Sequence, residues 1–164
     1  MQLFFTEMDT PVGVLKLVAH DQALVAVMWE NENPKRVRLA TLLQQDDHPI
    51  LCKTKQQLQE YFAGQRQQFD LPLDFEGTVF QQSVWHALLE IPFGETRSYK
   101  QIAEQVGNVK AVRAVGAANG KNPISIIAPC HRVVGANGKL VGFAGGLDNK
   151  AILLELESSL LKAE

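Results

Sequence analysis

The sequence lacks the features that mark several special classes of protein. Its 164 residues contain only two cysteines, Cys52 and Cys130, which lie far apart and belong to no Cys-x-x-Cys pair, so neither a disulfide framework nor a zinc cluster is predicted. No stretch approaches the roughly 18 uninterrupted apolar residues of a membrane span. The N-terminal residues have no basic region typical of a signal peptide. With an apolar fraction of 46%, the composition is that of a folded protein, for which we expect a cytoplasmic location and no membrane partner.

The chain also lacks a large net charge, but its charges are unevenly distributed. There are 16 basic and 18 acidic side chains, which give a net charge of −2. Residues 96–150 nevertheless hold eight basic and two acidic residues, a local charge of +6, and the remainder carries −8. The eight are Arg97, Lys100, Lys110, Arg113, Lys121, Arg132, Lys139 and Lys150. Such a segment predicts contact with a polyanion such as DNA, and a solvated basic face that binds nothing is the alternative.

The first residues are predicted to form a small antiparallel sheet. Short β-prone runs at residues 3–5, 12–18 and 23–28 are separated by turn residues, a pattern typical of a strand meander. We expect a helix to follow within residues 35–44.

A second helix is expected before the middle of the chain. It should begin at the capping box Thr54-x-x-Gln57 and end at Gly64. Its apolar side carries Leu58, Tyr61 and Phe62. The turn-rich stretch 71–77 then reads as a connection between domains, and we place the boundary there, with residues 1–74 and 75–164 as the two domains.

The C-terminal half is predicted to be mainly helical. Capping boxes at residues 78–81 and 98–101 each open a helix, and a third helix should run from about 110 to 119. Two short helices joined by a tight turn suggest a helix-turn-helix, although any helical hairpin would look similar. The hairpin-turn signal at residues 135–138 resembles the wing of a winged-helix domain.

The helix at 110–119 has an unusually bare side. Plotted at 100° per residue, one side carries Ala111, Val112, Ala114, Val115 and Ala118. The opposite side holds Arg113, flanked by Gly116 and Ala117. Small residues are what entry into a widened minor groove requires, and Arg113 could then reach into the base stack. Close packing against another helix is the alternative, because it also selects glycine and alanine.

Cys130 is the strongest candidate for a reactive side chain. His131 and Arg132 follow it directly, and both kinds of group stabilise a thiolate. The C-terminal helix has an apolar side formed by Ile152, Leu153, Leu154, Leu156, Leu160 and Leu161. Glu157 falls inside that side, where a carboxylate needs a partner that an imidazole could supply. The alternatives are a cysteine buried only for packing and a glutamate that reaches solvent at the edge of the helix face.

Together these segments resemble the O6-alkylguanine-DNA alkyltransferase family, the methylated-DNA–protein-cysteine methyltransferases of direct-reversal repair. The most specific segment is the pentapeptide Pro129-Cys130-His131-Arg132-Val133. The resemblance covers nearly the whole chain. In family order it also includes Phe80-Gln81-x-x-Val84-Trp85, Ile91-Pro92-x-Gly94-Glu95-Thr96, Tyr99, Arg113-Ala114-Val115-Gly116, Asn119-Gly120-x-Asn122-Pro123, Gly145-Gly146 and Glu157.

The resemblance implies a fold and an activity. The fold would be α/β (α+β), with a ribonuclease-H-like supporting domain at 1–74 and a winged helix-turn-helix domain at 75–164 that binds DNA and accepts the alkyl group. The protein would bind double-stranded DNA in the minor groove and flip out O6-alkylguanine, with O4-alkylthymine a further possible substrate. It would take the alkyl group irreversibly, once per molecule, as a monomer without cofactor or metal.

The resemblance also implies roles for individual residues. Cys130 would be the nucleophile and methyl acceptor, His131 would remove its proton through a water, and Glu157 would orient the imidazole. Asn122 would brace the turn before the active-site segment. The DNA-binding residues would be Tyr99, Arg113, Gly116, Ala117 and Arg132. The base pocket would be formed by Tyr99, Val133, Phe143, Ala144 and Gly145.

One departure from the family and two other functions remain open at this point. Phe143 stands where the family usually has tyrosine, so a polar contact from that position is in doubt. A winged-helix damage sensor with an inert Cys130 is the main alternative, and a Cys–His hydrolase is a more distant one. Cys52 is interpreted as structural.

Overall fold

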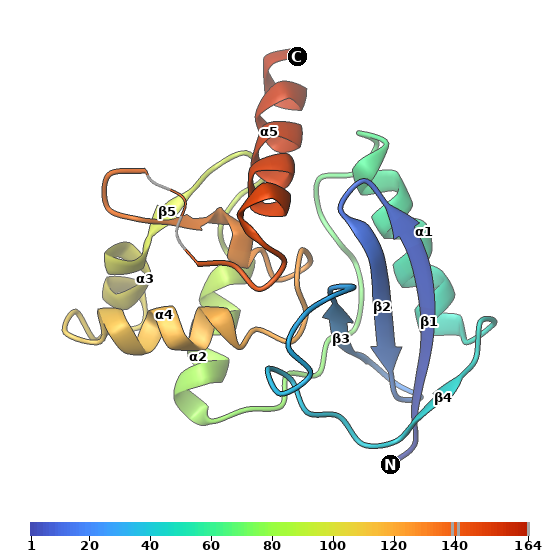
Figure 1. Ribbon diagram of the computed structural model, residues 1–164. Coiled ribbons are helices and arrows are strands. Elements are labelled where there is room, and N and C mark those ends of the chain that lie inside the picture. The colour runs from blue at the N-terminus through green and yellow to red at the C-terminus, as the bar shows by residue number, and fades with distance from the viewer. Residues whose placement is uncertain (139, 141, 164) are drawn as a thin grey trace.

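A four-stranded sheet forms the N-terminal half of the protein, whose computed structural model describes residues 1–138, 140 and 142–163 (Figure 1). The strands are β1 (Leu3–Thr10), β2 (Gly13–Ala19), β3 (Leu24–Met28) and β4 (Leu42–Gln44), in the order β3-β2-β1-β4. The first three pair antiparallel, so the predicted meander is confirmed. Gly13, with φ +96°, closes the turn between β1 and β2, a backbone conformation that glycine adopts without strain.

The prediction of a helix within residues 35–44 is wrong. A short turn occupies the first part of this stretch, and β4 then pairs parallel with β1, Leu3 opposite Leu42. The free edge of β1 offers backbone hydrogen bonds to an extended segment. The hydrogen bonds that stabilise β4 depend on β1, which lies far away in the sequence. The local pattern of residues 35–44 therefore did not predict this strand.

Helix α1 (Pro49–Phe62) begins five residues before the predicted capping box. His48 is its N-cap, with Nδ1 accepting from the Ile50 amide at 3.2 Å, and proline suits the first helical position because its missing amide hydrogen is not needed there. Thr54 lies inside the helix and donates to the Ile50 carbonyl oxygen at 2.7 Å. The predicted start is therefore wrong. The end lies close to Gly64, as predicted.

The C-terminal half is mainly helical, as predicted. Its elements are α2 (Val79–Leu89), β5 (Arg97–Ser98), α3 (Tyr99–Gln105), α4 (Val112–Gly120), the 3₁₀ turn η1 (Cys130–Arg132), β6 (Val133–Val134) and α5 (Leu147–Ala163). Both predicted capping boxes are present, at Thr78 and at Ser98. Helices α3 and α4 form the expected helix-turn-helix pair. Figure 1 shows the sheet with α1 on one side of the molecule and α2, α3 and α4 on the other.

The predicted wing is present only as far as its turn. The Gly138 amide donates to the Gly135 carbonyl oxygen at 2.8 Å. The strand expected after this turn includes Lys139 and Val141, which lie outside the described residues. Among the described residues, β6 pairs parallel with β5 instead.

The two halves are joined along the outer edge of β3. The Val27 amide donates to the Pro123 carbonyl oxygen at 2.9 Å, and the Ser125 amide donates to the Val27 carbonyl oxygen at 3.4 Å. The loop that precedes Cys130 thus pairs with the N-terminal sheet. One apolar core runs through both halves, from Leu17 on the sheet to Val115 on α4. Within the part of the chain that is described, no helix is long and apolar enough to cross a membrane.

Candidate functional site

The loop before Cys130 is folded around Asn122, whose side chain is completely buried. Its Nδ2 donates to the Ala128 carbonyl oxygen at 2.9 Å, and its Oδ1 accepts from the Ile124 amide at 3.0 Å. These bonds cross the loop and satisfy backbone groups that no regular element pairs. The bracing geometry expected for Asn122 is therefore present.

The same loop is held in a strained form from outside. Ile126 has φ +72°, which is costly for a β-branched residue and persists only where the surroundings impose it. Arg36, from the coil after β3, donates to the Asn122 carbonyl oxygen at 2.7 Å and to the Gly120 carbonyl oxygen at 3.2 Å. Glu32 holds the guanidinium in place at 2.8 Å. The N-terminal half thus fixes the loop that leads to the cysteine.

Cys130 opens the turn η1 and is 4% exposed. Burial raises the pKa of its thiol, and the Asn122 side chain and the charges of Arg36 and Lys150 oppose that shift. The net direction is upward, so the resting group is a thiol that needs a base before it can act as a nucleophile.

His131, the residue expected to act as that base, lies next to Cys130 in the sequence. His131 is fully buried, and its Nε2 lies 2.7 Å from Glu157 Oε2. Its Nδ1 has no hydrogen-bond partner among the described residues. With Glu157 ionised, the network assigns the imidazole proton to Nε2, which leaves Nδ1 with a free lone pair. Burial lowers the pKa of His131, so the imidazole is neutral and able to accept a proton.

Glu157 lies on the buried side of α5, as predicted, with an exposed fraction of 1%. Burial alone would raise its pKa. Hydrogen bonds and charge from His131 and Arg132 outweigh burial and hold that pKa at about 2. A buried charge of this kind requires such partners. The alternative of a glutamate reaching solvent is excluded, and Glu155, on the same helix, is exposed.

The predicted DNA contact of Arg132 is wrong. Its side chain is 7% exposed and binds Glu157 through Nε at 2.8 Å and Nη2 at 3.0 Å. Its Nη1 donates to the Ile91 carbonyl oxygen at 2.7 Å. All three nitrogens of the guanidinium therefore form hydrogen bonds inside the protein. A buried carboxylate without a cationic partner is costly, whereas a phosphate outside the protein is solvated. Arg132 neutralises Glu157 instead of contacting DNA.

Two residues near the site were missed in the sequence. Lys150 is fully buried and its Nζ donates to the Val133 carbonyl oxygen at 2.7 Å. Tyr61, from α1, donates its hydroxyl hydrogen to Glu157 Oε2 at 2.6 Å. Lys150 could have been found, because it precedes Leu153 and Glu157 by three and seven residues on one side of the helix. Nothing local to Tyr61 pointed to a partner 96 residues away.

Helix α4 presents the small face expected of it, with one change. Arg113 and Ala117 are exposed, and Gly116 lies against the ring of Tyr99. The buried side consists of Val115, Ala118 and Asn119. Of the remaining members predicted for that side, Ala111 is half-buried at the N-cap, and Val112 and Ala114 are exposed, because this short helix contacts the core only along one narrow stripe.

The residues predicted to form the base pocket come from three segments. Tyr99 is half-buried at the start of α3, and burial raises the pKa of its hydroxyl, so the hydroxyl keeps its proton. Val133 is fully buried, and Phe143 and Ala144 are half-buried. At Gly145, a Cβ atom would lie 2.5 Å from the Trp29 ring. It is a glycine because the N-terminal half packs against it.

The basic segment is less exposed than its composition suggests. Arg132 and Lys150 are buried, Arg97 is half-buried beside Glu95, and Lys139 lies outside the described residues. Exposed positive charge is carried by Lys100, Lys110, Arg113 and Lys121. These residues belong to α3, to α4 and to the segments that flank α4, so the positive surface lies around the bare helix.

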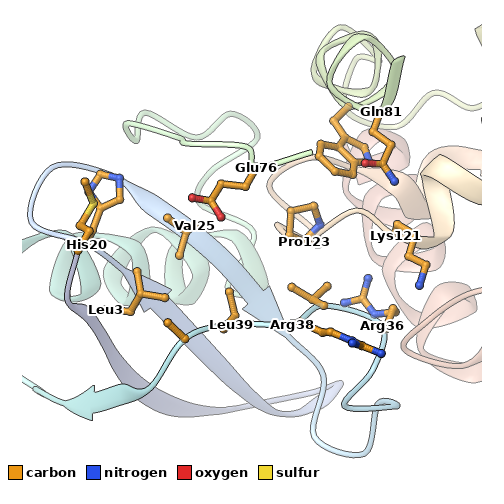
Figure 2. Close-up of a pocket in the computed structure, with 14 residues that line it drawn as sticks. Leu3, His20, Val25, Arg36, Arg38, Leu39, Glu76, Gln81, Lys121 and Pro123 are labelled. Carbon is orange, nitrogen blue, oxygen red and sulfur yellow. The ribbon is translucent and has the colours of Figure 1, made fainter. Parts of the chain in front are cut away.

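A cavity of about 360 Å³ lies between the two halves but away from Cys130. Figure 2 shows Arg36, Lys121 and Pro123 at one end of it and His20 and Leu3 at the other. None of its lining residues belongs to the group formed by Cys130, His131 and Glu157. In the described ranges, no group of three or more histidine, cysteine or acidic side chains could hold a metal ion.

Known proteins resemble the chain over both halves. The 6-O-methylguanine DNA methyltransferase, ribonuclease-like domain, matches residues 3–75, and the DNA binding domain of the same name matches residues 79–159. The methylated-DNA–protein-cysteine methyltransferase of Mycobacterium tuberculosis is 46% identical over 164 residues, which cover 99% of this chain and 96% of that protein. The constitutive methylated-DNA–protein-cysteine methyltransferase of Bacillus subtilis is 46% identical, and the alignment covers 94% of this chain and 94% of that protein. The crystal structure of Mycobacterium tuberculosis OGT in complex with DNA has a TM-score of 0.87 at 47% identity, covering 96% of this chain and 94% of that one.

Proposed function

Because the chain belongs to the 6-O-methylguanine DNA methyltransferase family, we propose that it repairs DNA by taking the alkyl group of O6-alkylguanine onto Cys130. The observation that carries the proposal is the buried hydrogen bond between a neutral His131 and an ionised Glu157, next in sequence to the buried thiol of Cys130. The relatives named above bear methyltransferase names, which does not favour a damage sensor with an inert cysteine.

The reaction is a direct displacement at carbon. The proton of the Cys130 thiol passes through a water to His131 Nδ1, and the sulfur attacks the alkyl carbon. The new S–C bond forms as the C–O6 bond breaks. The departing guanine anion takes up a proton from solvent, and the imidazolium afterwards releases the thiol proton to solvent. Glu157 holds the imidazolium that forms, and the Tyr99 hydroxyl donates a hydrogen bond to the guanine. The thioether is stable, so each molecule reacts once.

The target atom lies inside the duplex, so the nucleotide must leave the base stack at a cost of a few kcal/mol. We propose that α4 enters the minor groove with Gly116 and Ala117 against the sugar edges. Arg113 fills the space left by the flipped nucleotide. The exposed positive charge around α4 supports contact with phosphates. We also propose residues 1–74 as the supporting domain, residues 75–164 as the DNA-binding and alkyl-accepting domain, and a cytoplasmic monomer.

Transfer is tested directly by mass. Incubating the protein with excess duplex DNA that contains O6-methylguanine should add one methyl group to each molecule, and peptide mapping should locate it on Cys130. The stoichiometry follows from a single acceptor that is not regenerated. An unchanged protein mass, or a methyl group on Cys52, would contradict the proposal.

Replacing Arg113 with alanine should affect duplex substrates alone. Because the side chain stabilises the flipped state, losing about 1.4 kcal/mol of that help slows transfer from duplex DNA about tenfold. The rate with free O6-benzylguanine should not change, since that base needs no flipping. Lys110→Ala is the matched control, because it removes a neighbouring exposed charge and should alter only the salt dependence of binding. Equal loss toward both substrates would show that Arg113 serves folding or chemistry instead.

A further inference from the structure

The Glu157 carboxylate is contacted from both halves of the protein. Tyr61 lies on α1 in the N-terminal half and is completely buried, and its hydroxyl is 2.6 Å from Glu157 Oε2. Its ring packs against Phe62, Phe69 and Phe93. These apolar contacts would serve a phenylalanine equally well, so the hydroxyl is the part of the residue that needs an explanation.

The two carboxylate oxygens of Glu157 accept different numbers of hydrogen bonds. Oε1 accepts from Arg132 Nε at 2.8 Å. Oε2 accepts from Arg132 Nη2 at 3.0 Å, from His131 Nε2 at 2.7 Å and from the Tyr61 hydroxyl at 2.6 Å. The oxygen that faces the imidazole is therefore the crowded one. Each further donor draws charge from that oxygen and leaves less to stabilise a proton on His131.

The surroundings of His131 decide whether it rests as a base. From η1 it experiences the charge of Arg132, and from α5 it faces Glu157 and experiences the charge of Lys150. Burial and the two cations lower its pKa, and Glu157 alone raises it. Burial and the nearby carboxylate raise the pKa of Tyr61 far above neutrality, so this hydroxyl always has a proton to donate.

We propose that Tyr61 is a positioning residue for alkyl transfer: its hydroxyl fixes Glu157 Oε2 and moderates its charge, so that His131 rests as a neutral imidazole. This inference depends on the proposed roles of Cys130, His131 and Glu157. It assigns to the N-terminal half a direct part in setting the base, in addition to supporting the loop at Asn122.

The expected effect of Tyr61→Phe has a definite sign. Without the hydroxyl, Glu157 concentrates its charge on His131, so the imidazole holds its proton to higher pH. Transfer requires the neutral base, and the pH at which its rate is half-maximal should therefore rise, by about half a unit for one lost neutral hydrogen bond. The plateau rate should fall by about threefold, because the carboxylate that orients the imidazole is held less firmly.

Two measurements test the inference, and they separate it from the proposed function. The first is the rate of methyl transfer in a single turnover as a function of pH, with duplex DNA containing O6-methylguanine. The second is the titration of His131 followed by NMR without DNA. If no methyl group reaches Cys130 in the unaltered protein, the proposed function fails, and the NMR titration still decides whether Tyr61 controls the pKa of His131.

Thr54→Val is the matched control. It removes a buried hydroxyl from the same helix, and that hydroxyl contacts Ile50 instead of Glu157. It should lower stability without moving the pH midpoint. Placing 3-fluorotyrosine at position 61 gives a stronger donor and should move the midpoint down, a result that does not depend on Tyr61→Phe folding well. Unshifted titrations in the fluorinated protein, or an equal shift in Thr54→Val, would overturn the inference.

Discussion

Replacing Cys130 with alanine will abolish alkyl transfer and leave affinity for duplex DNA unchanged. The thiol is the proposed acceptor of the alkyl group, and His131 has no thiol to deprotonate without it. The side chain is 4% exposed and lies behind the loop that Asn122 braces, so its loss does not alter the surface of α4. Transfer is measured by the methyl group gained, and binding by titration with DNA that contains O6-methylguanine.

The chain provides its own control for that experiment. Cys52 is exposed and its Sγ lies 3.3 Å from the Asp46 carbonyl oxygen, far in sequence from the site. Cys52→Ala should accept one methyl group per molecule at the normal rate. Residual transfer in Cys130→Ala, or lost transfer in Cys52→Ala, would show that the acceptor has been assigned to the wrong cysteine.

Replacing Glu157 with glutamine will lower the free energy of unfolding by about 3–5 kcal/mol, the usual cost of leaving a buried charge unpaired. The charge left behind is that of Arg132, whose Nε and Nη2 both point at the carboxylate. Transfer should also slow greatly, because a neutral amide cannot stabilise the imidazolium. Urea unfolding gives the first quantity and single-turnover rates give the second.

Two further variants test the reason for that loss. Glu155→Gln, exposed on the same helix, should change neither quantity. Combining Arg132→Met with Glu157→Gln removes both charges and should recover part of the stability but none of the rate. If Glu157→Gln alone were fully stable, the buried ion pair would not be holding α5 to η1.

The pH dependence of stability has the same origin. The pKa of Glu157 is about 2 in the folded protein and ordinary in the unfolded chain, so the unfolded state takes up its proton first as the pH falls. The contribution of Glu157 is complete above its ordinary pKa and is lost as the pH falls toward 2. Unfolding curves of the Glu157→Gln variant should lack this part of the acid destabilisation.

The features that were predicted correctly from the sequence depend on residues that lie close together along the chain. The capping boxes at Thr78 and Ser98 depend on contacts three residues apart, and both are present. The burial of Glu157 could be read from the spacing of apolar residues on a single helix. The pentapeptide around Cys130 places a histidine next to the cysteine through chain connectivity alone.

The failures had long-range causes. Strand β4 forms because β1 offers a free edge, and α1 starts early because His48 and Pro49 cap it better than Thr54 does. Arg132 was predicted to contact DNA, yet it binds a buried carboxylate that lies 25 residues away in the sequence. No property of residues 54–64 indicated that Tyr61 would reach a helix at the other end of the chain.

The pairing of the loop at residues 123–125 with the edge of β3 also bears on what Cys130 can react with. The hydrogen bond between Val27 and Pro123 ties the loop to the edge strand β3, whose Val27 side chain lies in the core, so loosening the loop means breaking the sheet edge as well. Local unfolding near the thiol therefore has a high free-energy cost. Only a large cooperative opening would expose the thiol to oxidants in solution. Because Cys130 can react only once, this protection keeps its thiol available for an alkylated base that is bound at the site.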